Sequence, residues 1–502
     1  MNPVDIAKSL QLDTGGMLMG SDVMGQISNT TFERLTKALV ASPSTPGGPG
    51  DGSSLIPQSL ARTLKNVSFK MRNVKMWRAI AKQPAFAMNE EFDQLLSYGT
   101  RGGIFTGAMA TPQGNDSTFS RVQVPMKYMA TAYATDIAIM ATEVIGGSAE
   151  ALQINNATRY LLGGLERQLF YADSSLMPSA FDGVKAQIQN FATNNGFGNV
   201  VLNAGAGPVT IDLLENALQA IQDNAGDPES GLYSAYMAPR VQSYFTKTYA
   251  PAQRTEINRE RIIRDGKLWL GTPADGYNST YGPLGFVNDI FLDLGPELPV
   301  TSTIQGAPAI PTFGATPAVL NATDAASAWT NPLNASDYGV GYNGGPVTYK
   351  VAAVNAAGPS ELSVASNSVT VGAGESITLT WNRVTTSPTP NYYQIYRSMN
   401  GGAYLPLTKV KDPGSGTTVS FTDENTVVAG TYDVFIINHD AEEGLVFKQL
   451  LPFFKWPLPI PALARYFAVA LLGAPIIYVP SRCAIITNVQ IPGGSQATAT
   501  LS

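Results

Sequence analysis

The sequence has very few of the residues on which most catalytic and metal sites depend. It contains one cysteine, Cys483, and one histidine, His439, among 502 residues. A single cysteine excludes an intrachain disulfide, and one residue of each kind excludes a zinc site built from several histidine and cysteine ligands. Any nucleophile activated by a histidine would have to use His439, which we expect to be an ordinary loop residue. The apolar neighbours of Cys483 predict a small buried hydrophobic residue.

The common glycine-rich signatures are also missing. We find no P-loop, no G-x-G-x-x-G dinucleotide fingerprint and no G-x-S-x-G nucleophile elbow. Two groups of carboxylates occur, and we expect both to lie in solvated loops: Glu90, Glu91 and Asp93, then Asp440, Glu442 and Glu443. The sequence therefore predicts no enzyme, no metal and no cofactor.

Neither a leader nor a membrane span is evident. The amino terminus lacks a basic region followed by an apolar core, so we expect no signal peptide. The apolar stretch 466–480 is shorter than the roughly 20 residues that a span needs, and Pro475 interrupts it. We expect two buried strands here, joined by a Gly-Ala-Pro turn.

Charge is scarce and slightly negative. Only 14% of residues are charged and the net charge is −6, so the chain should not coat nucleic acid by bulk electrostatics. Hydrophobic residues make up 44% of the chain, which is typical of an ordered globular protein. At this length, two or three domains are expected.

A long amphipathic helix is the clearest single element. Apolar residues recur at helical spacing at Ile154, Ala157, Leu161, Leu165 and Leu169. The pattern predicts a helix over 148–172, about 37 Å long at 1.5 Å per residue. We expect Ser148 to cap it and Glu150 to suit its first turn. Because Gly163 and Gly164 cost helix propensity, we expect close packing against another backbone there.

Other elements give an α/β or α+β core. Residues 85–120 lack a helical period and predict an extended hairpin that leans on a neighbouring subunit. Alternation over 121–128 predicts a half-buried strand, in which Pro125 favours an edge or a bulge. A second helix is expected between Thr210 and Gly226, and a strand over 232–238 followed by a further helix.

A change of composition near Pro299 marks an inserted β domain. Alternating patterns follow at 349–354, 377–381 and 393–398. Short strands with glycine, proline and asparagine turns predict a sandwich, at about 339–428. The motifs are similar to those of fibronectin type III domains, although the pattern of the late strands comes first, which points to a permuted or immunoglobulin-like module. The core resumes near Gly430.

Three segments together resemble the major capsid protein of tailed bacteriophages, which has the Hong Kong 97 fold. They are the long helix with its flanks at 148–173, the Phe181-Asp182-Gly183-Val184 turn, and the final segment at 463–489. The resemblance implies an α+β fold with an added all-β immunoglobulin-like sandwich. Its domains would be an amino-terminal arm at 1–65, an extended loop at 76–127, a peripheral domain at 66–75 and 128–204, an axial domain at 205–300 and 430–502 whose last strands return to the peripheral domain, and a linker plus insertion at 301–429.

The resemblance also implies a function and partners. Such proteins self-assemble as hexamers and pentamers into an icosahedral head around double-stranded DNA, bound without sequence specificity. The implied location is the virion, with assembly in the bacterial host cytoplasm, and the implied partners are portal, scaffolding and decoration proteins, with no membrane. Two alternatives stay open: an encapsulin-type nanocompartment shell, and a carbohydrate-active enzyme with a fibronectin-like module.

Basic residues cluster where acidic ones are absent. Between Gly52 and Asn89 the chain has no acidic residue. We interpret this region as a solvated or intersubunit face, with contact to packaged DNA as the alternative. The predicted intersubunit contacts are Arg62, Lys65, Lys70, Arg72, Lys75 and Arg78, together with Arg101 farther along the chain.

Overall fold

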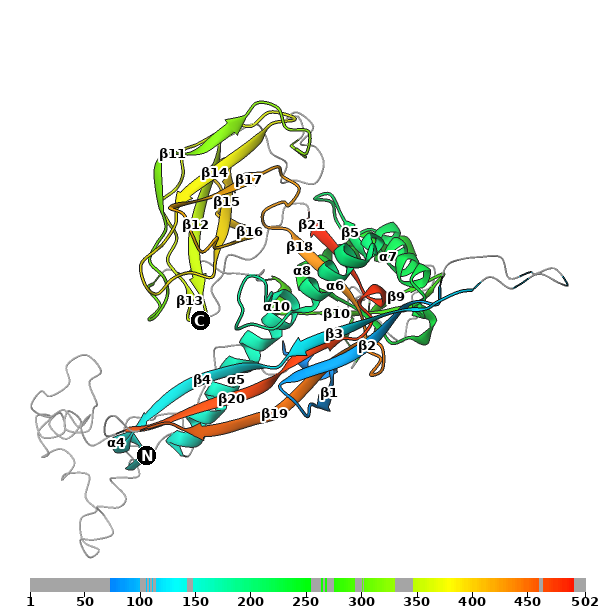
Figure 1. Ribbon diagram of the computed structural model, residues 1–502, viewed down its shortest axis with the longest axis horizontal. Helices are drawn as coiled ribbons and strands as arrows, with labels where there is room; N and C mark the ends of the chain where they lie inside the picture. Colours follow the sequence, from blue (N-terminus) through cyan, green and yellow to red (C-terminus); the bar gives the residue numbers. More distant parts are fainter. Residues whose placement is uncertain are drawn as a thin grey trace, which may run out of the picture. The chain divides into compact units, whose positions relative to one another are not determined.

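The computed structural model shows a mixed α+β protein (Figure 1). It describes residues 73–491, apart from breaks at 100–104, 106–107, 109–110, 112–113, 142–147, 254–262, 265–266, 269–274, 294–299, 301, 330–345 and 460–463. No described helix is both long and apolar enough to cross a membrane.

One long four-stranded sheet supports the longest helix. Its strand order is β1 (Ala81–Pro84), β19 (Leu445–Pro457), β20 (Ala464–Ile477) and β4 (Lys127–Asp136). Helix α5 (Ala149–Tyr171) runs alongside β4 and β20 (Figure 1). Its buried face includes Leu161, Leu165 and Leu169, as the apolar spacing predicted. The predicted helix is therefore confirmed.

Strand β20 corrects the expected turn at Gly-Ala-Pro. The strand continues through Gly473, Ala474 and Pro475 instead of folding back. The Pro475 carbonyl accepts a hydrogen bond from the Gln187 side chain, on the side away from β19. In an antiparallel strand the N–H and C=O of a residue point the same way, so the N–H that proline lacks would also have pointed away from β19. Pairing with β4 has already ended at Gly473, so no ladder bond is lost.

A second, six-stranded sheet forms the other part of the core. Its order is β5 (Val201–Asn203), β21 (Ala484–Val489), β18 (Tyr432–Asn438), β6 (Tyr233–Met237), β10 (Gly282–Asn288) and β9 (Gly276–Ser279). Helices α6 (Val184–Asn195), α7 (Ile211–Asp223), α8 (Pro239–Gln253) and α10 (Ile290–Asp293) accompany it. Cys483 is fully buried, as predicted. The remaining short elements outside the two sheets are α3 (Met76–Ala79), α4 (Ile137–Ala141) and the separate pair β7 (Ile263–Arg264) and β8 (Lys267–Leu268).

The helix ends test the capping predictions. The Thr210 side chain accepts a 3.2 Å hydrogen bond from the Leu213 N–H, so the predicted cap of α7 is confirmed. The Ser148 side chain makes no cap hydrogen bond. Glu150, in the first turn of α5, instead pairs with Lys455 and Arg465 from the neighbouring strands. The prediction for Ser148 was therefore wrong.

The two glycines in and after α5 have opposite surroundings. A Cβ on Gly164 would meet nothing within 4 Å, so the expected close packing is wrong at this residue. A Cβ on Gly183, at the start of α6, would lie 2.8 Å from the Gln168 carbonyl oxygen and 2.9 Å from the Ala172 nitrogen. The Phe-Asp-Gly turn therefore needs glycine because it closes directly onto the last turn of α5.

Between α10 and β18 the chain forms a separate β domain with its own core. One sheet has the order β11 (Thr312–Asn321), β14 (Ser376–Asn382), β17 (Thr418–Asp423). The other has the order β13 (Gly358–Pro359), β12 (Val347–Asn355), β15 (Tyr392–Met399), β16 (Leu405–Lys411). Residues of both sheets, among them Trp381 and Tyr393, share one hydrophobic cluster. The paired strands begin with β11, earlier in the chain than the alternating patterns showed.

Three serines seal one edge of β12. Each donates its backbone N–H to a β12 carbonyl oxygen, and each hydroxyl accepts the N–H of the same β12 residue. This serine ladder pairs Ser360 with Ala353, Ser363 with Val351, and Ser366 with Tyr349. Together with β13, which pairs with the last two residues of β12, the serine ladder occupies the backbone groups along this edge and closes it to further pairing.

Candidate protein-interaction surface

A two-stranded hairpin is exposed along much of its length. Strands β2 (Asn89–Ser97) and β3 (Thr118–Pro125) pair with each other and with no other described strand. The hairpin predicted for 85–120 is confirmed, with β3 reaching Pro125. The single strand predicted over residues 121–128 is wrong, because β3 ends at Pro125 and a new strand, β4, begins at Lys127. Pro125 lies at the end of an edge strand, as predicted.

Large aromatic side chains on and beside this hairpin face solvent. We call them the hairpin aromatics: Phe86, Tyr98, Phe105, Phe119 and Tyr128. Their exposed fractions range from 68% for Tyr128 to 92% for Phe105. Exposed apolar side chains in such numbers are typical of surfaces that bind other proteins. A subunit contact was expected in this segment from its composition, but its aromatic residues were not singled out.

The β2 strand of the hairpin is anchored to the core. Lys448 on β19 contacts Glu90 at 3.0 Å, with the two side chains only 12% and 21% exposed. The Gln94 side chain donates a 2.6 Å hydrogen bond to the Tyr478 carbonyl oxygen, and Phe92 packs edge-on against the Tyr478 ring. These contacts fasten β2 to the core of the protein. The exposed aromatic residues of the hairpin are therefore held by a strand whose position is fixed.

The acidic cluster on β2 is part of this strand and not of a solvated loop. Arg121 on the partner strand donates a 2.9 Å hydrogen bond to Asp93 and lies 3.9 Å from Glu91. The Arg121 guanidinium holds the pKa of the Asp93 carboxyl below its usual range. Because cross-strand cations occupy these carboxylates, the cluster does not resemble an acid–base pair.

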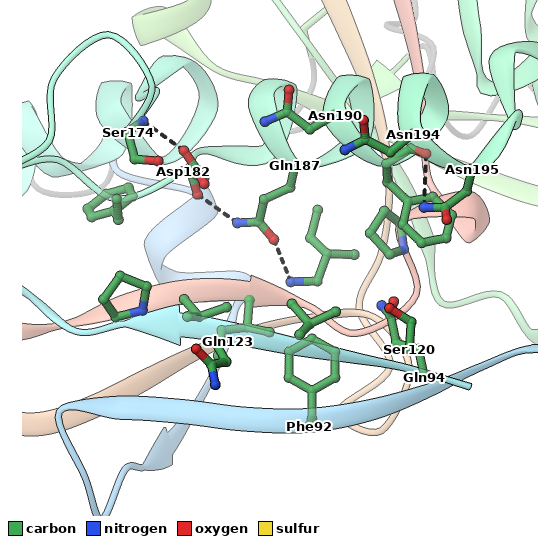
Figure 2. Close-up of a pocket in the computed structure, with 18 of the residues that line it drawn as sticks. Phe92, Gln94, Ser120, Gln123, Ser174, Asp182, Gln187, Asn190, Asn194 and Asn195 are labelled. Atoms are coloured by element: carbon green, nitrogen blue, oxygen red, sulfur yellow. Dashed lines mark hydrogen bonds between the residues drawn. The ribbon is translucent and has the colours of Figure 1, made fainter. Parts of the chain in front are cut away.

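A cleft of about 340 Å³ lies between the hairpin and α6 (Figure 2). Amide side chains dominate its polar lining, and Gln187 spans the cleft wall by donating to the Asp182 and Pro475 carbonyl oxygens and accepting from the Ile477 N–H. The charged lining residues are Lys127 and Asp182, which hydrogen bond to the Pro178 carbonyl and the Ser174 N–H. This arrangement can bind a polar backbone but has no pair of converging acids.

The single histidine and cysteine are used in packing. His439 follows β18, as expected of a loop residue, but its Nε2 lies 3.0 Å from the Tyr236 hydroxyl. Burial lowers the pKa of His439 to about 4, so the ring is neutral near pH 7. Burial also raises the pKa of the Cys483 thiol to about 12. Among the described residues no three histidine, cysteine, aspartate or glutamate side chains gather into a metal site.

Two of the predicted intersubunit residues fall within the described chain. Lys75 is half-buried and its ammonium contacts the Asn288 side chain, whereas Arg78 is exposed on α3. Lys82, from the same basic run, lies with its ammonium 4.8 Å from the Trp77 ring centre. The other predicted contacts lie outside the described residues: Arg62, Lys65, Lys70, Arg72 and Arg101.

No family model matches the chain. Among curated proteins, it is 24% identical over 470 residues to the major capsid protein of Staphylococcus phage S25-3, covering 89% of this chain and 92% of that protein. The major capsid protein of Staphylococcus phage K gives the same identity and coverage. These relatives confirm the function expected from the sequence, that of a major capsid protein.

Solved structures with partial similarity include a capsid of an empty GTA particle, at 9% identity and a TM-score of 0.41, covering 89% of this chain and 98% of that one. Gordonia phage Cozz matches at 10% identity and a TM-score of 0.42, with the same coverage of 89% and 98%. The SrpI encapsulin of Synechococcus elongatus PCC 7942 matches at 8% identity and a TM-score of 0.40, covering 85% and 92%.

Proposed function

We propose that copies of this chain tile into the icosahedral shell of a phage head, as hexamers and pentamers that enclose double-stranded DNA. The observation that carries the proposal is the anchored hairpin with its exposed aromatics, in a chain whose relatives are major capsid proteins over nearly their whole length. The proposal makes the hairpin a contact between neighbouring copies. In a closed symmetric shell, one such contact is repeated in every subunit.

The energy available from the hairpin aromatics is sufficient for a weak repeated interface. Burying one aromatic side chain removes about 150–250 Å² from water. At about 25 cal/mol per Å², half of that burial contributes roughly 2–3 kcal/mol per side chain. Each contact is weak by itself, but a closed shell repeats it in every subunit. Assembly therefore adds to the stability of each folded subunit.

The shell would enclose the packaged DNA without binding it strongly. The net charge of −6 gives no general attraction to phosphate. Of the predicted basic contacts, Lys75 is already engaged with Asn288, within the same chain. We therefore place the chain in the virion, with portal, scaffolding and decoration proteins as further partners, and with DNA bound without sequence specificity.

The proposed architecture is that of the Hong Kong 97 fold. In it, α5 is the spine helix of the peripheral domain, β2 and β3 form the extended loop, and the six-stranded sheet belongs to the axial domain. The β domain is an immunoglobulin-like insertion with fibronectin-like motifs. Support for this last assignment comes from its two sheets around one core and from the strands at 347–355, 376–382 and 392–399.

Assembly of hairpin variants tests the proposal. Phe86→Ser and Phe119→Ser each remove an aromatic that is 90% and 70% exposed, so the fold should keep its stability within about 0.5 kcal/mol. We expect the full-length wild type to form shells in negative-stain microscopy and sedimentation, and the variants to stay as small species. Val364→Ser is the matched control, because Val364 is 73% exposed but lies in the β domain.

Two results would count against the proposal. The first is a wild-type protein that remains monomeric at every concentration at which the relatives' shells would form. The second is shell formation by both hairpin variants at wild-type yield, which would remove the hairpin from the interface.

A further inference from the structure

Two buried carboxyl groups interact beside the chain segment that leads into the hairpin. Glu166 lies in the second turn of α5 from its carboxyl end, and Asp289 lies between β10 and α10. Both residues are 0% exposed. Neither has a role in the proposed assembly surface, and carboxylates this deep are rarely found without a cation.

Glu166 holds the start of α3. One carboxylate oxygen accepts hydrogen bonds from the backbone N–H groups of Lys75 and Met76, at 2.7 and 2.5 Å. The other accepts from the Trp77 N–H at 2.9 Å. The first N–H groups of a helix have no partner within it, so Glu166 satisfies three donors that would otherwise be buried and unpaired. Helix α3 is thereby fastened to α5.

Asp289 fastens the other side of the same segment. Its Oδ1 accepts a 2.9 Å hydrogen bond from the Phe291 N–H, which starts α10. Val74, just before α3, packs with Phe291 in a small cluster that Trp77 also joins. The buried Oδ2 of Asp289 has no hydrogen-bond partner among the described residues. An ionised aspartate with a bare buried oxygen is costly, which favours a proton between the two carboxyl groups.

The groups around Glu166 and Asp289 allow the pair to keep one proton near neutral pH. Burial first, and then repulsion from Asp289, raise the pKa of Glu166 to about 8, and burial raises the pKa of Asp289. Lys75, just before α3, favours the ionised form of Asp289, and Lys82 from β1 interacts with Glu166. Tyr236 from β6 and Tyr171 from α5 also face the pair; both keep their protons, and the Tyr236 hydroxyl contacts His439.

We propose that Glu166 and Asp289 form a proton-dependent clamp, which holds segment 74–80 against α5 and α10 while the pair carries one proton and releases it when that proton is lost. The release would reach the hairpin, because α3 is followed directly by β1 and then by β2. Trp77 packs against Phe447 and Phe453 of β19, so α3 also carries an aromatic anchor to the long sheet. The clamp does not rest on the capsid assignment.

The direction of the pH effect follows from the two states. In the closed state the second proton leaves only near pH 8, whereas solvated carboxyl groups in the open state lose theirs near pH 4 to 5. A raised pKa in the closed state means that closure is fully favoured at low pH and is weakened as the pH rises through about 8. Loosening is therefore expected on the alkaline side.

Hydrogen exchange on the full-length protein measures the clamp. Exchange of peptides covering 74–80 is followed by mass spectrometry at pH 6, 7, 8 and 9, with rates divided by the intrinsic rate at each pH. If opening releases one proton, the protection factor of this segment should fall by up to about tenfold per pH unit until the pair is ionised. Peptides from α7 serve as an internal reference whose protection should not follow this curve.

Asp289→Asn tests the mechanism. The asparagine oxygen can still accept from the Phe291 N–H, while its amide can donate to the Glu166 carboxylate, so no shared proton is needed. We expect protection of 74–80 in this variant to be independent of pH between 6 and 9. Asp433→Asn is the matched control, because Asp433 is a partly buried aspartate that contacts Lys185 at 2.7 Å, and it should keep the wild-type pH dependence.

Three outcomes would overturn the clamp. Protection of 74–80 that does not change with pH in the wild type would exclude it. The same pH dependence in Asp289→Asn as in the wild type would assign the effect to another group, and loss of the dependence in Asp433→Asn would show that it is not specific to this pair.

Discussion

The Arg397 guanidinium donates a 2.7 Å hydrogen bond to the Asp423 carboxylate across the two sheets of the β domain. The two side chains are 0% and 3% exposed. The Tyr349 hydroxyl donates to the same carboxylate oxygen at 2.7 Å, and the Trp329 ring lies 4.9 Å from the guanidinium carbon. A polar network therefore joins strands from both sheets within an otherwise apolar core.

Breaking this pair should destabilise the β domain strongly. Arg397→Met leaves the Asp423 charge buried without its cation, which typically costs about 3–5 kcal/mol. Pulse proteolysis of the full-length chain in urea, following cleavage within 347–423, would measure the loss. The double variant Arg397→Met, Asp423→Leu should cost less than the two single variants added together, because no lone charge remains. A strictly additive double variant would show that the pair is not coupled.

Substitution by alanine should change the free energy of unfolding in opposite directions at Gly183 and Gly164. Gly183→Ala places a Cβ within 3.0 Å of three backbone atoms at the end of α5, which cannot move independently, so we expect a loss of about 1–3 kcal/mol. Gly164→Ala is the matched control within the helix: it meets nothing within 4 Å and should gain up to about 1 kcal/mol. Thermal unfolding of both variants decides this. Equal effects in the same direction would contradict the structural account.

His439 should make the folded state sensitive to acid. Its pKa falls from 6.5 to about 4 on folding because burial disfavours the imidazolium. A lowered pKa means that the stabilisation is complete above pH 6.5 and is lost as the pH falls to about 4, a change of up to roughly 3 kcal/mol.

The variant His439→Gln isolates this effect, since glutamine can still accept from the Tyr236 hydroxyl but does not titrate. Urea midpoints at pH 7, 6, 5 and 4 should decline less steeply in the variant than in the wild type. Parallel declines would assign the acid sensitivity to carboxylates elsewhere.

The serine ladder should contribute through its hydroxyl groups. Ser363→Ala removes the acceptor of the Val351 N–H, which lies in the buried edge of β12 at 2.9 Å. Leaving that donor unsatisfied should cost about 1–3 kcal/mol. Val364→Ala changes the exposed neighbour and should stay within about 0.5 kcal/mol. Chemical unfolding of the β domain within the full chain compares the two, and equal midpoints would show that the hydroxyl is dispensable.

Local pattern was a good guide wherever one periodicity dominated. The apolar stripe that ends at Leu169 located α5 to within a residue at each end, and Thr210 marked the start of α7. Pattern failed where a distant segment supplied the partner. The Gly-Ala-Pro sequence in β20 looked like a turn, and only the Gln187 side chain, nearly 300 residues earlier, shows why the strand continues through Pro475.

The candidate surface divides in the same way. A glycine-rich segment without helical period was enough to predict the hairpin. The basic run, in contrast, gave residues of which Lys75 contacts Asn288 in the same chain. The aromatics could not be selected from the sequence, because Phe86 and Phe92 look alike there, yet one is exposed and the other packs against Tyr478.

By itself, the amino-acid sequence determined that this chain has one histidine and one cysteine, that a long helix precedes a Phe-Asp-Gly turn, and that a β-rich segment interrupts an α+β core. These properties depend on residue counts and on local periodicity. Only the tertiary structure decided that Glu166 and Asp289 share one buried site, and that a Cβ would meet backbone atoms at Gly183 but open space at Gly164. Burial and the meeting of distant segments determine both, because the energy of a charge or of a methyl group depends on what surrounds it in space.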